Sequence, residues 1–418
     1  MKCKRPASRA FSDIPPKLAL PDRVRGERVL VVDIVLIVVL VVALIIGVQR
    51  GLFASLGTLV GVAGGGIAAF WLIPIVNDAV PWPQWRGLIV LAVAVLVLVT
   101  GALLGSALGM AIRRGADRIR LKGIERLLGG AVSVIVAALA ISLVGQSVAA
   151  TGMPIVSQAL SSSQVLRTIE EITPRPVQAT LAQLRGAVLD EGLPTLGTLL
   201  DGAVSPGAPE VALDDPALAA AARSVGRVSG VAYACGTSAT GTGFVIAPDR
   251  VVTNAHVVAG VETPVVELPG VAAREGRIVY FDPIDDLAVI AVDDLGADVL
   301  PVVPTLAAGA GAVVQGYPYG GPFEMGGAEV ISVGPAQVPD IYDDATAERE
   351  VYALAATVRP GNSGGPLLTT AGEVAGVVFA RAENDDNLGY AMTTTELTPV
   401  LAQAEGLDAA VSSGRCAG

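Results

Sequence analysis

Three side chains in the second half of the sequence could together activate a serine nucleophile. Histidine occurs once in 418 residues, as His256 in the stretch VVTNAHVV. Asp286 opens the apolar run DLAVIAV, and Ser363 lies in RPGNSGGPLL. A serine hydroxyl needs a base to take its proton, and imidazole suits this role near neutral pH. A buried carboxylate then holds the imidazole tautomer and stabilises the imidazolium. The three residues predict acyl transfer through a His-Asp-Ser triad.

The glycines around the serine have a physical reason. A developing oxyanion is best stabilised by backbone N–H groups that converge on one point. Glycine permits the unusual backbone that this requires at no steric cost. We assign the two donors to the amides of Gly361 and Ser363.

The order of the three residues along the chain separates the folds that use this chemistry. GNSGG matches the G-x-S-x-G elbow of α/β-hydrolases, but there the histidine follows the serine, and no histidine follows Ser363. Asp249 would give the order of subtilisin, but the surrounding pattern is not that of an α/β sheet. His, Asp, Ser is the order of chymotrypsin-type double barrels. A lone histidine also argues against a multi-histidine metal site, and no metal or other cofactor is expected.

The elements that must position these residues are short strands. From residue 227 onward, β-branched segments are separated by Gly and Pro, which predicts an all-β barrel or sandwich. Strands are expected at 227–234, 241–248, 250–254, 276–282, 286–292, 312–317, 373–380 and 388–392, and a helix at 393–404. Asp285 stands beside Asp286, and a shift of one residue turns a strand side chain to the other face. Only one of the two can therefore contact His256.

The first part of the chain is apolar. Four runs, at 29–48, 52–73, 88–112 and 127–150, have about the length of 20 residues that crosses a hydrocarbon core. They predict an α-helical membrane module of four transmembrane helices. Glycines recur at every fourth residue of the second and third runs, a spacing that lets helices approach closely in lipid. Asp33 is either a functional intramembrane residue or a side chain that reaches the interface.

The distribution of Lys and Arg predicts how the transmembrane helices are oriented in the membrane. The loop 113–126 carries six Lys or Arg and the tail before the first run carries eight. Three helices separate them, so both cannot be cytoplasmic under the positive-inside rule. We place the loop inside, which puts both termini outside. Residues 1–28 are then an anomalous basic tail, and one hypothesis is that translation begins near Val24 or Val29.

The remaining chain is acidic. Residues 151–418 carry 12 Arg, no Lys and 32 Asp or Glu, a balance that repels nucleic acid. Residues 151–213 lack long apolar runs and predict a linker with short helices. Residues 214–418 then form the catalytic domain, and residues 29–150 the membrane domain. The expected partners are the lipid bilayer and protein or peptide substrates, and the sequence predicts no oligomeric state.

The motifs resemble two known families. DIVLIVVL running into QRGLFASLG resembles the colicin V production family of four-helix membrane proteins. TNAHVV, DDLAVIAV and GNSGGPLL resemble trypsin-like proteases of the high-temperature-requirement type. The whole arrangement resembles the mycobacterial membrane-anchored acid-resistance serine proteases. That resemblance implies an extracytoplasmic (periplasmic) domain on a multi-pass inner-membrane anchor, which cleaves cell-envelope proteins under acid or oxidative stress.

The resemblance also implies roles for particular residues. Asp286 is favoured over Asp285 because the acid of the family directly precedes LA. The substrate pocket is expected around Thr357 and the segment Phe379, Ala380 and Arg381. Because no acid stands at Thr357, a preference for Lys or Arg is not indicated.

Cys235 and Cys416 lie near the two ends of the catalytic domain. An outside location favours a disulfide bond between them. Two alternatives to the endopeptidase stay open: a membrane transport or scaffold protein whose protease-like domain only binds peptides, and an esterase or acyltransferase that uses the same triad.

Overall fold

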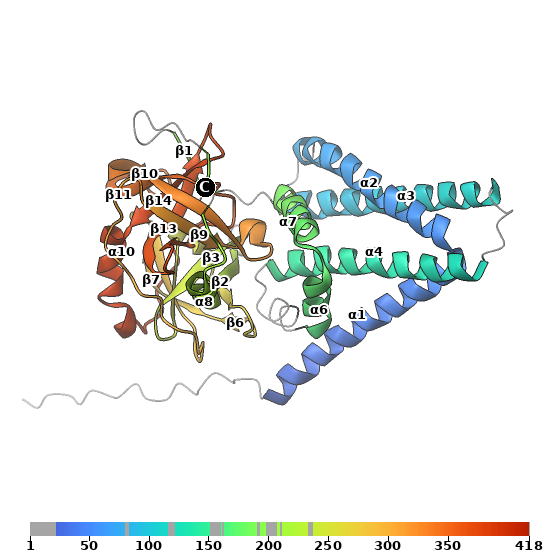
Figure 1. Cartoon of the computed structure of the whole chain (residues 1–418), viewed down its shortest axis with the longest axis horizontal. Helices are drawn as coiled ribbons and strands as arrows, with labels where there is room; N and C mark the ends of the chain where they lie inside the picture. Colours follow the sequence, from blue (N-terminus) through green and yellow to red (C-terminus); the bar gives the residue numbers. More distant parts are fainter. Residues whose placement is uncertain are drawn as a thin grey trace, which may run out of the picture.

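The computed structural model describes residues 22–79, 83–115, 122–150, 160, 163–189, 193–197, 207–209, 211–232 and 237–417. They form a helical N-terminal region and a β-rich C-terminal region, with two shorter helices between them (Figure 1). The predicted basic tail as far as residue 21, and Cys235, lie outside the described residues.

Four long helices coincide with the four predicted apolar runs. They are α1 (Asp22–Arg50), α2 (Leu52–Ala79), α3 (Pro83–Gly115) and α4 (Lys122–Ala150). Among the described residues, two stretches are long and apolar enough to cross a membrane, Val31–Arg50 and Gly123–Gly145. The corresponding stretches of α2 and α3, Leu52–Ala68 and Leu96–Ile112, are shorter. Large apolar side chains of α1 are exposed, as an apolar solvent would require.

Glycine brings α2 and α3 into backbone contact. A Cβ atom added at Gly105 would lie 2.0 Å from the carbonyl oxygen of Gly57, and one at Gly61 would lie 2.1 Å from that of Gly101. No larger residue fits at these crossing points. The predicted role of the four-residue glycine spacing is therefore seen in the structure, as close helix packing.

Two shorter helices follow the long ones, α6 (Gln164–Ile172) and α7 (Arg175–Leu189). Ser163 caps α6 by accepting the amide of Leu166 at 3.2 Å, and its hydroxyl donates to Asp33 of α1 at 2.5 Å. The Asp33 carboxylate also lies at the N-terminus of α6, where negative charge is favourable. Asp33 thus ties α1 to α6.

The first sheet of the β-rich region has seven strands. It follows α8 (Pro216–Ala221) and the 3₁₀ turn η1 (Ala222–Ser224). Asp215 caps α8 and Pro216 is its first residue, an arrangement that favours a helix start. The strand order is β6-β5-β2-β3-β4-β8-β7. Their bounds are β2 (Val225–Ala232), β3 (Thr237–Ala247), β4 (Arg250–Thr253), β5 (Val265–Glu267), β6 (Arg274–Glu275), β7 (Arg277–Asp282) and β8 (Leu287–Ala291).

The second sheet also has seven strands, in the order β1-β13-β12-β9-β10-β11-β14, and an additional pairing of β13 with β14 closes six of them into a ring. Their bounds are β1 (Thr195–Leu196), β9 (Gly311–Gly316), β10 (Glu324–Pro339), β11 (Thr346–Ala355), β12 (Pro366–Thr369), β13 (Val374–Ala382) and β14 (Leu388–Thr393). The turn η2 (Pro318–Gly320) follows β9. One large buried cluster contains side chains from both sheets, including Phe244 and Phe379.

The chain ends by returning to the first sheet. After α10 (Thr394–Leu401) and η3 (Ala404–Gly406), the amide of Val411 donates to the carbonyl of Ile278 at 2.9 Å. The carbonyl of Ser413 accepts from Gly260 at 3.1 Å. Arg250 donates to the carbonyl of Leu407 at 2.9 Å. This C-terminal tail (residues 407–417) joins the last helix to the half of the domain that carries the histidine.

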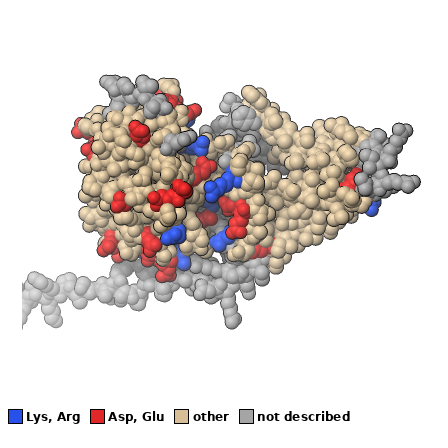
Figure 2. Space-filling view, in the orientation of Figure 1, with Lys and Arg blue, Asp and Glu red and all other residues tan. Residues whose placement is uncertain are grey.

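Charge follows the same division as the fold. On the face shown in Figure 2, the β-rich region carries many acidic side chains, whereas the described part of the long helices is mostly uncharged. Several basic side chains lie where the two regions meet (Figure 2).

Candidate active site

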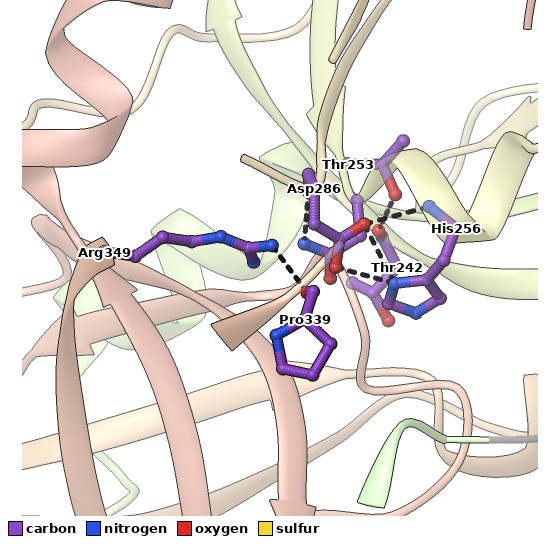
Figure 3. Close-up of polar contacts among 7 residues, drawn as sticks. Thr242, Thr253, His256, Asp286, Pro339 and Arg349 are labelled. Carbon is purple, nitrogen blue, oxygen red and sulfur yellow. Dashed lines mark hydrogen bonds and ion pairs between the residues drawn. The ribbon is translucent and has the colours of Figure 1, made fainter. Parts of the chain in front are cut away.

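His256 and Asp286 contact each other directly. His256 lies in the short helix α9 (Ala255–Val258), immediately after β4, and Asp286 immediately precedes β8. The Nδ1 atom of His256 lies 3.0 Å from Oδ1 and 2.8 Å from Oδ2 of Asp286 (Figure 3). The backbone amide of His256 also donates to Oδ1 at 2.9 Å. Because the carboxylate accepts at Nδ1, the lone pair of the neutral imidazole is placed on Nε2.

Asp286 is held in place by the turn that carries His256. It is 3% exposed and its backbone has φ 54°, in the left-handed region that aspartate tolerates better than most residues. The side-chain amide of Asn254 donates to the Asp286 carbonyl at 2.9 Å. The conformation at Asp286 aims its carboxylate at His256.

The neighbouring Asp285 has a different environment. Its amide donates to the carboxylate of Asp282 at 3.1 Å. Partial burial, and next the nearby Asp282 carboxylate, raise the pKa of Asp285. The structure therefore places Asp286, and not Asp285, against the imidazole.

Ser363 lies in the loop between β11 and β12 and is 3% exposed. Its carbonyl accepts from the amide of Thr242 at 2.8 Å. A Cβ atom added at the next residue, Gly364, would be 2.9 Å from the amide nitrogen of Asn254, so the serine loop packs on the turn that carries His256. Nε2 of His256 is buried and has no hydrogen-bond partner among the described residues. Catalytic hydrogen bonds are often long before substrate binds.

Gly361 has the backbone that an oxyanion site requires. Its φ is 91°, and a Cβ atom there would lie 2.3 Å from the carbonyl oxygen of Tyr317, so only glycine fits. The amides of Gly361 and Ser363 donate to no other residue in the part of the chain that the structure describes. Both are available to a developing oxyanion.

Thr242 connects the two halves of the site, and sequence reasoning missed it. Its hydroxyl donates to the carbonyl of Gly361 at 2.6 Å and accepts from the amide of Tyr317 at 3.0 Å. Its carbonyl accepts from the hydroxyl of Thr253 at 2.7 Å (Figure 3). One fully buried threonine on β3 therefore joins the loop of Ser363 to the strand that leads into His256.

Arg349 is a second residue that the sequence did not indicate. It lies on β11, is 1% exposed, and donates to the carbonyl of Pro339 at 2.9 Å (Figure 3). Its guanidinium carbon is 6.0 Å from the centre of the Phe379 ring. Burial lowers the pKa of Arg349, and the carboxylates of Asp286 and Asp285 oppose this. A buried positive charge therefore acts on the carboxylate that holds the histidine.

The expected pocket residues have different surroundings. Thr357 is exposed and its hydroxyl donates to the side chain of Asn387 at 3.1 Å. Phe379 and Ala380 are buried in the main cluster. Arg381 forms an ion pair with Asp386 at 2.6 Å.

The cysteines can be placed only in part. Cys416 is disulfide-bonded. Its expected partner, Cys235, lies outside the described residues, so the pairing stays a prediction.

Comparison with known proteins identifies the class. Residues 241–377 match the family described as trypsin-like peptidase domain, and residues 32–174 match the family described as colicin V production protein. A trypsin-like serine endopeptidase is thus joined to a colicin V production domain.

Serine protease Rv3671c from Mycobacterium tuberculosis (strain ATCC 25618 / H37Rv) is 36% identical over 310 residues, which are 72% of this chain and 78% of that protein. The chain belongs to the family of this serine protease. Serine protease Do-like HtrB from Bacillus subtilis (strain 168) is 29% identical over 161 residues, 37% of this chain and 35% of that protein. A crystal structure of the Rv3671c protease in its active form shares 36% identity, covers 53% of this chain and 100% of that chain, and has a TM-score of 0.48.

Proposed function

We propose that His256, Asp286 and Ser363 form the catalytic triad of this serine endopeptidase. The observation that carries the proposal is the paired contact of the Asp286 carboxylate with Nδ1 of His256. It leaves Nε2 buried and without a hydrogen-bond partner among the described residues, so this nitrogen would be the base that takes the Ser363 proton. The hydroxyl then attacks the scissile carbonyl, and the imidazolium returns the proton to the leaving amine as the acyl-enzyme forms. Water hydrolyses the acyl-enzyme through the same base.

The amides of Gly361 and Ser363 are the proposed oxyanion hole. The positive φ of Gly361 supports this assignment because it turns the backbone in a way that other residues disfavour. Removal of one oxyanion donor typically costs 10²–10³ in kcat. The pocket is proposed to lie between Thr357 and the segment Phe379, Ala380 and Arg381. The two sheets would correspond to a double barrel of the chymotrypsin type.

The helical region is proposed to anchor the enzyme in a membrane by four crossings. Residues 29–150 would form the anchor, 151–213 the linker and 214–418 the protease domain. The length of Val31–Arg50 and Gly123–Gly145 supports two of the crossings. The glycine contacts of α2 with α3 support the other two as a packed pair.

The protease domain is proposed to be extracytoplasmic. The basic loop 113–126 would face the cytoplasm, and one further helix would bring the domain outside. Its substrates would be proteins of the cell envelope, with a role in the response to acid or oxidative stress.

The first test is labelling of the full-length protein with a fluorophosphonate, which reacts only with an activated serine. The protein should be labelled, and Ser363→Ala and His256→Ala should each abolish labelling. Envelope proteins from cells with active and Ser363→Ala enzyme, with and without acid stress, should then differ in their cleavage products. A protein that binds peptides but resists the probe would be a scaffold instead, and turnover of esters without peptides would indicate an esterase.

A further inference from the structure

One edge of β13 extends past the end of its pairing with β12, next to the serine loop. On one side, β14 covers β13 as far as Arg381. On the other side, β12 pairs only as far as Val377, because the chain before it turns away into the serine loop. The last bond there joins the amide of Gly364 to the carbonyl of Val378 at 2.8 Å. Beyond Val378, this edge can accept another extended chain, directly past Ser363.

A segment of the linker occupies that edge. β1 pairs with β13 in the parallel direction. The amide of Arg381 donates to the carbonyl of Pro194 at 3.1 Å, and the amide of Glu383 donates to that of Leu196 at 3.0 Å. Pro194 has no N–H of its own, so only its carbonyl can take part in the ladder. We call residues 193–197 the β1 segment.

Apolar side chains hold the β1 segment in place. Leu193 is 7% exposed and belongs to the buried cluster that contains Val358 and Val378. These two valines adjoin the proposed pocket positions Thr357 and Phe379 in the chain. Leu196 packs against the main cluster, whereas Thr195 is exposed. The segment is therefore seated by its backbone and by two leucines.

The same linker also contacts the other side of the site. Ala182 of α7 is 2% exposed and packs on Gly321, the residue after η2. A Cβ atom added at Gly321 would lie 2.4 Å from the Cβ of Ala182. Within η2, the amide of Tyr319 donates to the carbonyl of Pro360 at 2.5 Å. Pro360 directly precedes Gly361. Helix α7 thus contacts the turn that bonds to Pro360, and the β1 segment contacts the β13 edge.

We propose that the β1 segment occupies the edge of β13 beyond Val378 in competition with the backbone of an extended substrate. An incoming peptide would add to this edge by main-chain hydrogen bonds. Because two chains cannot use the same N–H and C=O groups, the β1 segment must leave before a long substrate binds. This inference rests on the proposed function and adds its regulation. Asp33 joins α1 to Ser163 at the start of α6, and the chain continues from α6 through α7 to the β1 segment. The long helices are therefore linked to the β13 edge through this part of the chain.

The test uses the full-length protein in detergent micelles. Leu193→Ser removes the buried anchor of the β1 segment, and Thr195→Ser changes an exposed residue of the same segment as a matched control. KM and kcat are measured with a fluorogenic octapeptide selected by cleavage with the parent enzyme. Labelling by a small fluorophosphonate, which needs no extended backbone, is followed in parallel. We expect Leu193→Ser to lower KM roughly tenfold, a shift of about 1.4 kcal/mol, with kcat and labelling rate unchanged.

Each outcome has a separate meaning. An unchanged KM in Leu193→Ser, with labelling intact, overturns the competition. Failure of the parent enzyme to be labelled overturns the proposed function instead.

A second measurement does not depend on folding of that variant. In Ser363→Ala protein saturated with the octapeptide, the backbone amides of residues 193–197 should exchange hydrogen at the rate of amides that have no hydrogen bond. Continued protection of these amides while the peptide is bound would contradict the proposal.

Discussion

The carboxylate of Asp286 accepts hydrogen bonds from both the ring nitrogen Nδ1 and the backbone amide of His256. It therefore both orients the imidazole and places a negative charge next to it. Asp286→Asn keeps the shape but presents an N–H where the ring needs an acceptor, which favours the wrong tautomer. We expect a loss of about 10⁴ in kcat. Asp285→Asn is the matched control and should retain activity within a few-fold. Steady-state kinetics on a peptide decide this, and a crippled Asp285→Asn enzyme would show that the roles are exchanged.

Asp285 also gives a prediction for stability. Its pKa is raised in the folded protein, chiefly by burial. The folded state therefore binds more protons than the unfolded state once pH exceeds the ordinary aspartate value of about 3.9. Stability at this site then falls as pH rises through the window between the two pKa values.

The variant Asp285→Asn lacks this penalty. Its unfolding midpoint should exceed that of the parent at pH 7, and the difference should vanish below about pH 4. Thermal unfolding at pH 3.5 to 7.5 tests this. A difference that grows as pH falls would contradict the assignment.

At the residue scale, the sequence predicted those site residues whose chemical role only a few residue types can perform. The single histidine and the resemblance of DDLAVIAV to a known family predicted the contact of His256 with Asp286, which the structure shows, whereas the contact of Ser363 with His256 stays a prediction. Thr242 and Arg349 could not be predicted in this way. A threonine in a β-strand and an arginine in a long hairpin are ordinary residues, and only their partners across the fold give them a role at the site.

At the scale of elements, the crossing of α2 and α3 depends on glycine. Gly105→Val would place a side chain 2.0 Å from the carbonyl of Gly57 and force the two helices apart. Gly64→Val is the matched control, because nothing lies within 4 Å of a Cβ atom there. Both variants replace glycine by valine within a helix, so the change in intrinsic helix propensity is the same in both.

We expect Gly105→Val to lower the thermal aggregation midpoint of the detergent-solubilised protein by several degrees, and Gly64→Val to leave it within about one degree of the parent. Equal shifts in the two variants would show that the helices do not depend on this contact.

Eight of the described strands were predicted from β-branched runs, but β5, β6, β12 and the hairpin of β10 and β11 were not. Its sequence contains Pro335, Gly327 and several charged residues, which mask the alternation that indicates a strand. β1 was also missed. Two residues give no periodicity, and their pairing with β13 is fixed by a strand that lies far away in the sequence.

At the scale of the whole molecule, the ends of the protease domain can be linked covalently. Cys235 and Cys416 should form a disulfide in protein taken from the envelope. A bond that closes so long a loop could stabilise the domain by roughly 5 kcal/mol, an upper figure.

Peptide mapping without reductant should find the two cysteines in one cross-linked fragment, and Cys235→Ser should lower the unfolding temperature and the activity together. Free thiols at both positions would rule out the bond and weaken the outside placement.

The C-terminal tail has a consequence for the time at which the enzyme becomes active. A chain is synthesised from its N-terminus, so the first sheet, with His256, is made before the residues that contact Gly260 and Ile278. Those residues, Ser413 and Val411, follow both sheets in the sequence. The half of the domain that carries the proposed base therefore acquires these contacts only after the second sheet has been synthesised. We expect a nascent protease to stay inactive until residues 407–417 have been made.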